Sequence, residues 1–423
     1  MDQGTTAFVL ICAALALLMT PALAFFYGGL VRASSAISLM MLSFGALALV
    51  AVLWIVFGYA VVNSSGNASG FVGIDGVFGI DTGLIGLGAL LQGADDSAPL
   101  AQAAFQCMFA IVAVALVSGA IADRARFGAW MVFAGLWASL VYFPVASWVF
   151  TVRWGADGMA GGGWIVYGLR DLVGAGVLDF AGGTAVHINA GAAALALALV
   201  LGKRTGVGSG PLKPHSIPFV LLGAALLWFG WFGFNAGSEG AADGFAALVV
   251  MNTLAAPAAA LLSWLVVETI RDGKATAVGA ASGVVSGLVA ITPACAYLTP
   301  LWAVLLGLLA GALCALAVNL KYVLGFDDSL DVVGIHLVGG LIGTLYLGFF
   351  ANGDGFIYSG RVDQLLAQAI GAVAVLVYSF AVTLALGYLV DKLMGFRVTT
   401  AIEQAGLDIA PYGQAAVGPD ATR

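Results

Sequence analysis

Long apolar runs constrain the fold of this chain more than any other feature of its sequence. Hydrophobic residues make up 62% of the 423 residues and charged residues only 9%, whereas about a quarter of the residues in a soluble domain are charged. A helix needs about 20 apolar residues to cross the hydrocarbon core of a bilayer. We therefore predict an all-α polytopic membrane protein with eleven transmembrane helices. The predicted spans are 5–30, 36–62, 99–122, 128–151, 181–202, 216–237, 241–271, 276–293, 297–320, 330–352 and 361–394.

The distribution of basic residues predicts the orientation of the chain. An odd number of spans places the two termini on opposite sides of the membrane, and Lys and Arg gather in cytoplasmic loops. If the C-terminus is cytoplasmic, only Arg153, Arg170 and Arg361 of the 15 basic residues fall in outer loops. We therefore expect the N-terminus outside and the C-terminus in the cytoplasm.

A repeated pattern places two of the three histidines inside apolar spans. The pattern is Asp, seven residues, His, three residues, Gly. An ionisable side chain is costly in hydrocarbon, so its presence at matched positions in two halves indicates a functional site and internal duplication. The two copies are Asp179, His187 and Gly191, and Asp328, His336 and Gly340.

The direction of the two copies indicates inverted halves. Span five enters from outside and span ten from inside, so each histidine lies about 12 Å along its helix from its aspartate and both approach mid-depth. An in-plane pseudo-two-fold axis would bring the histidines together, as in many transporters. We therefore predict an inverted five-plus-five repeat and a final helix. The predicted parts are a first five-helix repeat (1–202), a cytoplasmic linker (203–215), a second five-helix repeat (216–352), the eleventh helix (361–394) and a cytoplasmic tail (395–423).

The residues leave several interpretations of the histidine pair open. Two buried histidines can be neutral and serve only packing, or they can share one proton between the two imidazole rings. A zinc site would need three or four protein ligands, and neither an HExxH motif nor a suitably placed third His or Cys is present, so we predict no metal. The two aspartates can simply cap their helices.

Two predicted helix faces combine aromatic rings with a hydroxyl near their outer ends. Phe105 and Phe109 are four residues apart, and Trp231, Phe234 and Ser238 are spaced at i, i+3 and i+7, so each set shares one face. Aromatic faces attract cations, more strongly where water is excluded. The pattern indicates either a site for a small cation near Phe109 and Ser238 or ordinary core packing.

Six segments together resemble the ammonium transporter family (Amt/Mep/Rh), and in particular its bacterial Amt branch, over nearly the whole chain. The resemblance implies a homotrimer with a separate narrow pore in each subunit, embedded in the lipids of the cell inner (plasma) membrane. It implies ammonium or ammonia as the substrate, with methylammonium as an analogue, and neither an enzyme activity, a cofactor nor a nucleic-acid partner. The segments are TPALAFFYGGLVR at 20–32, FQCMFA at 105–110, DFAGGTAVHINAG at 179–191, GWFGFNAGS at 230–238, TPACAYL at 292–298 and DDSLDVVGIH at 327–336.

The resemblance also implies roles for individual residues. It implies an outer ammonium-recruitment site, a phenyl gate of two stacked rings below it, and twin histidines deeper in the pore. The matching positions are Phe109, Ser238, Phe105 and Gln106 for recruitment, Asp179 for support of that site, Phe109 and Phe234 for the gate, Trp231 for the pore lining, and His187 and His336 for the pore histidines.

The chain departs from the family pattern at the third wall of the recruitment site. The family usually has a Trp at the end of span four, and Phe150 most nearly aligns with it. Trp148 and Trp154 are the alternative third walls. A further departure follows the first span, where Arg32 precedes Ala-Ser-Ser in place of the family's Lys-Asn.

The tail keeps the Gly-Leu-Asp motif of the family as Gly406, Leu407 and Asp408. In the family this tail often mediates regulation by a PII-type signalling protein, although Tyr412 and Gln414 replace a common His and Glu here. We expect the motif to dock against the inner loops. The basic residues expected to lie opposite it are Arg124, Arg126 and Lys203.

The predicted function is a transporter that recruits ammonium at an aromatic site, deprotonates it and conducts ammonia through a hydrophobic pore past the histidines. A bare cation at mid-bilayer costs about 3 kcal/mol or more, which favours a neutral passenger. Three alternatives remain: an ammonium sensor with little flux, a gas channel of the Rh type, and an intramembrane metalloenzyme. Only residues 395–423 follow the last predicted span, which disfavours a sensor with a large output domain.

Overall fold

The computed structural model describes residues 2–91, 98–155, 158–206 and 214–414. Among these, ten helices are long and apolar enough to cross a membrane, which confirms the predicted all-α polytopic fold. The predicted eighth span corresponds to α11 (Ala277–Ile291), which has only 15 residues. The predicted linker and tail are described in part, because residues 207–213 and 415–423 lie outside the described residues.

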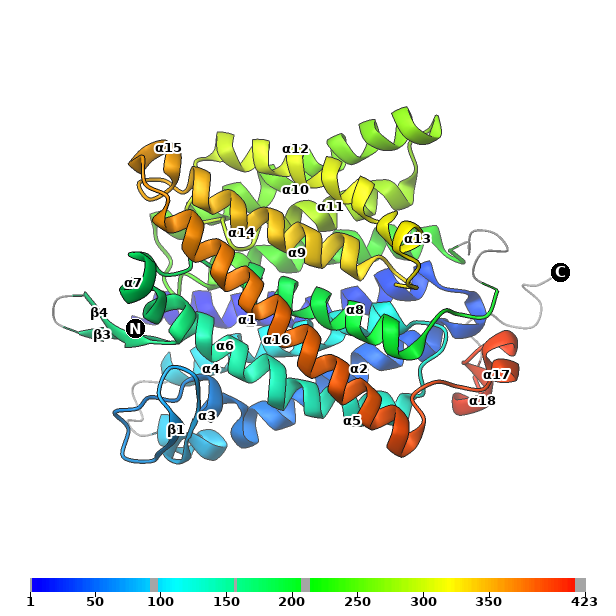
Figure 1. Ribbon diagram of the computed structural model, residues 1–423, viewed down its shortest axis with the longest axis horizontal. Coiled ribbons are helices and arrows are strands. Elements are labelled where there is room, and N and C mark those ends of the chain that lie inside the picture. The colour runs from blue at the N-terminus through cyan, green and yellow to red at the C-terminus, as the bar shows by residue number, and fades with distance from the viewer. Residues whose placement is uncertain (1, 92–97, 156–157, 207–213, 415–423) are drawn as a thin grey trace.

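The long helices run side by side along the longest axis of the molecule (Figure 1). Several spans contain a π-helical turn, a feature that often marks functional sites. These turns are Trp54–Gly58, Ala138–Tyr142, Gly183–Ile188 and Val333–Leu337. The helices of the ten spans are α1 (Gln3–Leu30), α2 (Ala36–Leu53) with α3 (Tyr59–Val62), α4 (Ala98–Val117), α5 (Phe127–Trp137) with α6 (Phe143–Phe150), α8 (Asn189–Leu201), α9 (Ile217–Gly237), α10 (Gly244–Asp272), α12 (Pro300–Ala317) with α13 (Leu320–Leu324), α14 (Val338–Phe350) and α16 (Asp363–Met394).

Short elements gather at the two ends of this bundle (Figure 1). One end, here named the hairpin end, carries two antiparallel hairpins and two short helices. The opposite end, named the tail end, carries α13 and the helices of the tail. The elements of the hairpin end are β1 (Phe71–Ile74) with β2 (Phe78–Asp81), β3 (Val152–Gly155) with β4 (Gly158–Gly162), α7 (Leu169–Val173) and α15 (Phe356–Ser359). The tail helices are α17 (Thr400–Ala405) and α18 (Ile409–Tyr412).

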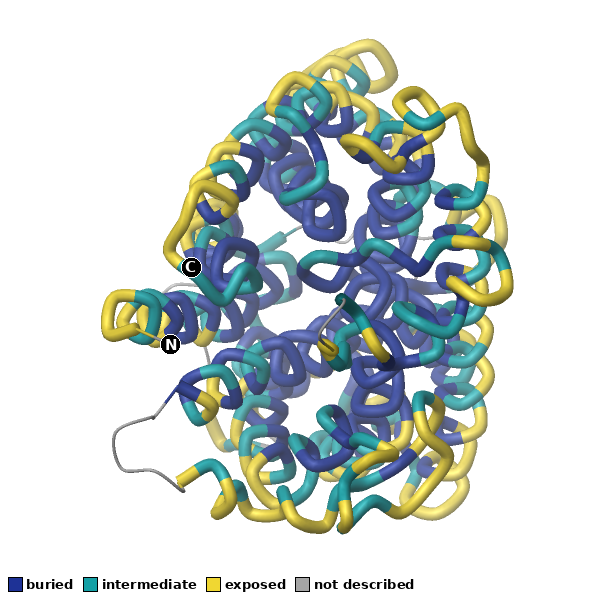
Figure 2. The backbone as a smooth tube through the Cα atoms, turned by 90° about the vertical axis from the view of Figure 1, so that its left-hand side faces the viewer, coloured by how far each residue is buried: buried dark blue, intermediate teal, exposed yellow. Residues whose placement is uncertain are grey.

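Buried residues occupy the middle of the bundle and exposed residues its rim (Figure 2). Large aromatic side chains such as Trp54, Trp130 and Trp137 are buried in the core. Large apolar side chains also lie on the rim, for example Leu262 of α10 and Leu309 of α12. An apolar rim of this kind suits contact with lipid, because hydrocarbon tails are as apolar as these side chains.

Candidate functional site

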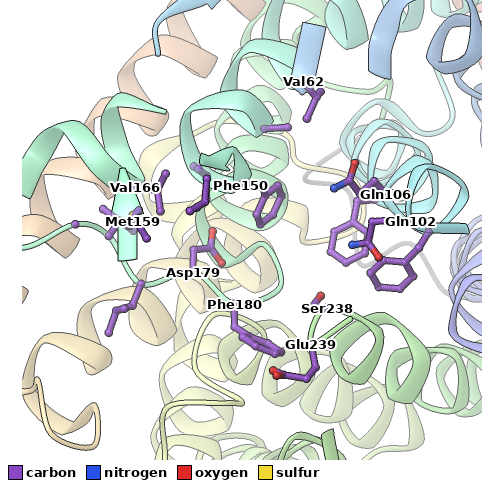
Figure 3. A pocket seen from close by; sticks show the side chains of 18 of the residues that line it. Val62, Gln102, Gln106, Phe150, Met159, Val166, Asp179, Phe180, Ser238 and Glu239 are labelled. Atoms are coloured by element: carbon purple, nitrogen blue, oxygen red, sulfur yellow. The ribbon is translucent and has the colours of Figure 1, made fainter. Parts of the chain in front are cut away.

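A cavity of about 560 Å³ opens at the hairpin end of the bundle. Its lining includes all five residues that the resemblance assigns to the recruitment site: Phe105, Gln106, Phe109, Phe150 and Ser238. These side chains come from α4, α6 and the end of α9, and Figure 3 shows Gln106, Phe150 and Ser238 around one space. The fold thus brings three distant segments of the sequence together around a single aromatic cavity.

A column of aromatic rings leads from this cavity into the bundle. Phe109 lines the cavity and stacks on Phe234, with ring centroids 3.9 Å apart and 16° between the planes. Phe234 contacts Trp231 at 5.8 Å, and Trp231 stacks on His187 at 5.5 Å. Rings stacked at this separation are in van der Waals contact. The Phe109–Phe234 stack therefore lies between the cavity and the rings deeper in the bundle.

His187 and His336 meet at the far end of this column. Their Nδ1 atoms lie 3.2 Å apart, and the two residues are only 1% and 3% exposed. When both rings are neutral, one Nδ1 donates and the other accepts, so the pair holds one proton between the rings. Across the described residues, His, Cys, Asp and Glu side chains nowhere gather in groups of three or more that could hold a metal ion.

The glycines of the repeated pattern explain why the two histidines meet. A Cβ atom on Gly191 would lie 2.4 Å from the backbone nitrogen of Leu337, and one on Gly340 would lie 3.0 Å from the carbonyl oxygen of Gly183. The two histidine helices therefore cross at these glycines, where there is no room for a Cβ atom. Small residues allow helices to approach this closely in membranes. Each histidine precedes its glycine by about one helical turn, so the crossing brings the rings together.

The two aspartates of the pattern cap the π-helical turns that carry the histidines. The carboxylate of Asp179 accepts four backbone N–H bonds of 2.6–3.1 Å from residues 182–185. Asp328 accepts one bond of 2.7 Å from the N–H of Val333, and its Oδ1 has no hydrogen-bond partner within the described ranges. Although Asp179 lines the cavity, its oxygens are occupied by the backbone. This geometry fits a residue that supports the site without touching the ion.

The three candidates for the third wall occupy different places. The ring centroid of Phe150 lies 6.0 Å from that of Phe109, edge to face, inside the cavity. Trp154 also lines the cavity but is 75% exposed on its hairpin. Trp148 packs instead against Tyr378, with ring centroids 4.7 Å apart. Of the three, Phe150 alone makes a ring contact with Phe109 in the described structure.

Gln368 fastens one wall of the cavity and was not anticipated from the sequence. Its Oε1 accepts the N–H of Leu178 at 2.7 Å, and its Nε2 donates to the carbonyl oxygen of the same residue at 2.9 Å. Leu178 directly precedes Asp179, so this pair of bonds fixes the backbone that presents the cap. The available signal was a pair of glutamines four residues apart, Gln364 and Gln368, in an apolar helix of 32 residues.

Thr292 is a second residue that sequence reasoning missed. Its Oγ1 accepts the indole N–H of Trp231 at 2.8 Å and is buried between α9 and α11. A buried indole N–H needs such a partner. Thr292 therefore fixes the orientation of the Trp231 ring within the column.

The tail packs against the start of α2. Asp408 accepts the N–H groups of Ile37 and Ser38 at 3.1 and 2.8 Å, and burial raises the pKa of its carboxyl group. Leu407 is buried, and Gly406 has a φ of 102° with Ser34 so close that a Cβ atom would not fit. All three residues of the motif are therefore engaged in docking the tail.

The side chains of two basic residues expected opposite the motif, Arg124 and Arg126, have other partners. Glu403 pairs with Arg397 at 2.7 Å. Arg124 is fully buried and donates to the carbonyl oxygen of Asp327 at 2.7 Å, and burial lowers the pKa of its guanidinium to about 10. Arg126 donates to the carbonyl oxygen of Met394. Asp408 itself is held by hydrogen bonds from the N–H groups at the start of α2.

The fold and the cavity together define a polytopic helical membrane protein in which a ring column joins an aromatic cavity to a buried histidine pair. The sequence model of the Ammonium Transporter Family matches residues 7–417. The chain is 51% identical to an ammonium transporter of Mycobacterium bovis, over 98% of this chain and 90% of that protein. It is 41% identical to an ammonium transporter of Bacillus subtilis, over 98% and 99% of the two chains. The chain belongs to the ammonium transporter family.

Solved structures agree with this assignment. A protein described as a sensor Amt protein superposes with a TM-score of 0.85 at 29% identity, covering 96% of this chain and 98% of that one. Mep2 of Saccharomyces cerevisiae superposes with a TM-score of 0.82 at 34% identity, covering 94% and 88%. The two relatives compared by sequence are both named ammonium transporters.

Proposed function

We propose that this chain recruits ammonium in the aromatic cavity, removes one proton and conducts ammonia along the ring column past the histidine pair. The observation that carries the proposal is the 3.2 Å contact between the Nδ1 atoms of His187 and His336 at the end of a closed column of rings. A cation that stayed charged would have to leave water for this apolar interior, which is costly. Loss of a proton removes that cost for ammonium, whereas potassium has no proton to lose.

The cavity offers ammonium two kinds of contact. The ring faces of Phe109 and Phe150 can hold a cation through their quadrupoles. The hydroxyl of Ser238 donates to the carbonyl oxygen of Phe234 at 3.2 Å, so its lone pairs are left to accept an N–H bond from the ion. The rings of Phe109 and Phe234 must part for the neutral molecule to pass between them. Separation of these two rings would act as a gate that selects the transported molecule by its charge and size.

The histidine pair would act once the neutral molecule has passed the gate. Because one proton lies between the two rings, the pair can take up the proton that ammonium loses and release another toward the tail end, so that one charge crosses with each ammonia and the pair never holds two charges. Trp231 stacks on His187 and separates the pair from the gate. A purely structural pair would leave the same contact in place but would take no part in transport.

Four further features belong to this proposal. The hairpin end would face outside and the tail end the cytoplasm of a cell bounded by its inner membrane. The apolar rim would contact lipid and two further copies of the chain in a homotrimer. The two five-helix halves would be related by an in-plane axis. Gly406, Leu407 and Asp408 would take part in regulation, with a PII-type signalling protein as the partner.

Current measured on purified protein in liposomes during an ammonium pulse tests the proposal. A current that saturates with ammonium, persists with methylammonium and is lacking with potassium would support it. A second candidate is a sensor with little flux, because one structural neighbour is described as a sensor Amt protein. Ammonium binding without measurable current or uptake would favour the sensor and overturn transport.

A further inference from the structure

Two carboxylates line the aromatic cavity, and they differ in what they can bind. Asp179 accepts four backbone N–H groups, which leaves little capacity for a ligand. Glu239 lines the same cavity. Among the described residues, its carboxylate takes part in no hydrogen bond or ion pair. Glu239 is thus the carboxylate of the cavity that is available to a cation.

Glu239 lies next to the groups that the proposed function assigns to ammonium. It directly follows Ser238 at the end of α9, and both residues are partly buried. Figure 3 shows the Glu239 side chain beside the ring of Phe180, on the same side of the cavity as Ser238. The side chain therefore lies within the cavity lining and not on a freely solvated loop.

A partly buried carboxylate without a partner favours a ligand that can donate hydrogen bonds and carry positive charge. Burial raises the pKa of Glu239, and the negative charge of Asp243 raises it further. The ionised carboxylate is therefore less stable here than in water. A charge-assisted hydrogen bond from an ammonium N–H would relieve this cost. Arg170, the basic residue of the cavity lining, is exposed on α7.

We propose that Glu239 is a further cation-binding group of the outer site, which captures ammonium in the cavity beside Ser238 and Phe109. This inference rests on the proposed function and adds a charged group to a site otherwise built of rings and a hydroxyl. Such a group raises the local concentration of the cation and contributes nothing to passage through the closed stack. Its loss should therefore change the half-saturation concentration and spare the maximal current.

The test is ammonium-driven current from full-length protein in liposomes, with Glu239→Gln, Glu239→Asp and Asp171→Asn compared with the wild type. Asp171 is an exposed carboxylate of α7 at the same end, and its substitution removes the same charge away from the cavity lining. Glu239→Gln should raise the half-saturation concentration about three- to fivefold, a change of the size expected for a partly exposed charge pair. Glu239→Asp should restore part of this loss, and Asp171→Asn should match the wild type.

Three results would overturn the inference. They are an unchanged half-saturation concentration in an assembled Glu239→Gln protein, equal shifts in the Glu239→Gln and Asp171→Asn proteins, or a loss of maximal current alone. Phe109→Ala, measured in parallel, separates this failure from that of the proposed function. A shift with Phe109→Ala but not with Glu239→Gln would remove only the role of Glu239. If neither variant altered the current, the proposed recruitment site would fail as well.

Discussion

The two histidine helices share one sequence pattern but end in different surroundings. At the Asp179 end the chain opens into an aromatic cavity of about 560 Å³. At the Asp328 end it is packed next to a buried ionic group in which Arg204 and Arg124 pair with Asp327. The carboxylate of Asp179 is fully used by the backbone, whereas one oxygen of Asp328 is without a partner in the described structure.

The comparison of the two ends separates the shared part of the pattern from the part that differs. Both copies bring a histidine to the same crossing, because cap, histidine and glycine have the same spacing in each. The flanking residues have diverged, with rings suited to capturing a cation at one end and ion pairs that anchor loops at the other. The repeated pattern places the two histidines at the centre of the molecule. The residues that flank each copy differ, and they determine the properties of the two ends.

The largest expected effect concerns the centre that the two copies share. His187→Leu and His336→Leu proteins should assemble, because a lost neutral hydrogen bond costs only about 1 kcal/mol, but should lose ammonium-driven current if the pair relays protons. His336→Glu should keep some current and reject potassium less well. The measurement is current from reconstituted protein under matched ammonium and potassium gradients. His215→Leu, a change outside the pair, is the control, and wild-type current in the double Leu protein would leave the pair as packing.

The next effect separates the two caps. Asp179→Ala leaves four backbone N–H groups without an acceptor and should lower the free energy of unfolding by about 2–4 kcal/mol, whereas Asp328→Ala removes one bond and should cost about 1 kcal/mol. Thermal unfolding of the purified proteins, read as a difference in midpoint, measures both. Asp179→Asn keeps one acceptor oxygen and should lie between Asp179→Ala and the wild type. Equal losses for the two Ala proteins would mean that the caps are equivalent.

A smaller effect is expected at the tail end. Deletion of residues 403–423 removes the Asp408 bonds to the start of α2 but none of the rings or histidines. The protein should remain folded, with its flux changed about two- to fivefold, the size of a weak coupling, or with binding of a PII-type protein lost. Flux assays and partner binding on the truncated protein measure these outcomes. Wild-type behaviour in both assays would show that the tail has no regulatory role.

The smallest effect sharpens the hairpin end. Indole is the strongest cation-binding ring, and one such contact contributes about 0.5–1 kcal/mol. Because Phe150 already supplies a ring, Phe150→Trp should gain only part of such a contact and lower the half-saturation concentration for ammonium by about twofold. Trp148→Phe alters a ring that packs against Tyr378 and should leave it unchanged. If the Phe150→Trp protein assembles and binds as the wild type does, Phe150 is not the third wall and Trp154 becomes the candidate.

Much of the candidate site could be predicted because its elements are local. The spacing of Phe105 and Phe109, and of Trp231 and Phe234, places each pair on one helix face, and the rings of both pairs are in contact. The aspartate of the pattern was expected as a cap, and Asp179 accepts four backbone bonds. Helical periodicity fixes such relations without knowledge of the rest of the fold.

Other parts of the site depend on contacts between distant segments. No local pattern distinguishes Phe150 from Trp148, because only the packing of α6 decides which ring meets Phe109. The tail was expected to pair with nearby positive charge, whereas Asp408 caps α2. The hydrogen bond between Gln368 and Leu178 joins residues 190 positions apart. No local sequence pattern predicts a bond over such a distance.

The sequence by itself determined the all-α polytopic class of this protein, the approximate limits of ten of its eleven predicted spans, and the presence of two histidines inside those spans. These follow from hydrophobic length, helical rise and the cost of ionisable groups in hydrocarbon. Only the tertiary structure decided that the two imidazoles lie 3.2 Å apart and that Phe109 closes on Phe234. It also decided that Asp179 accepts backbone hydrogen bonds, whereas the carboxylate of Glu239 has no hydrogen-bond partner among the described residues. Distances and hydrogen-bond partners depend on how helices cross, and the packing of the whole bundle sets that crossing.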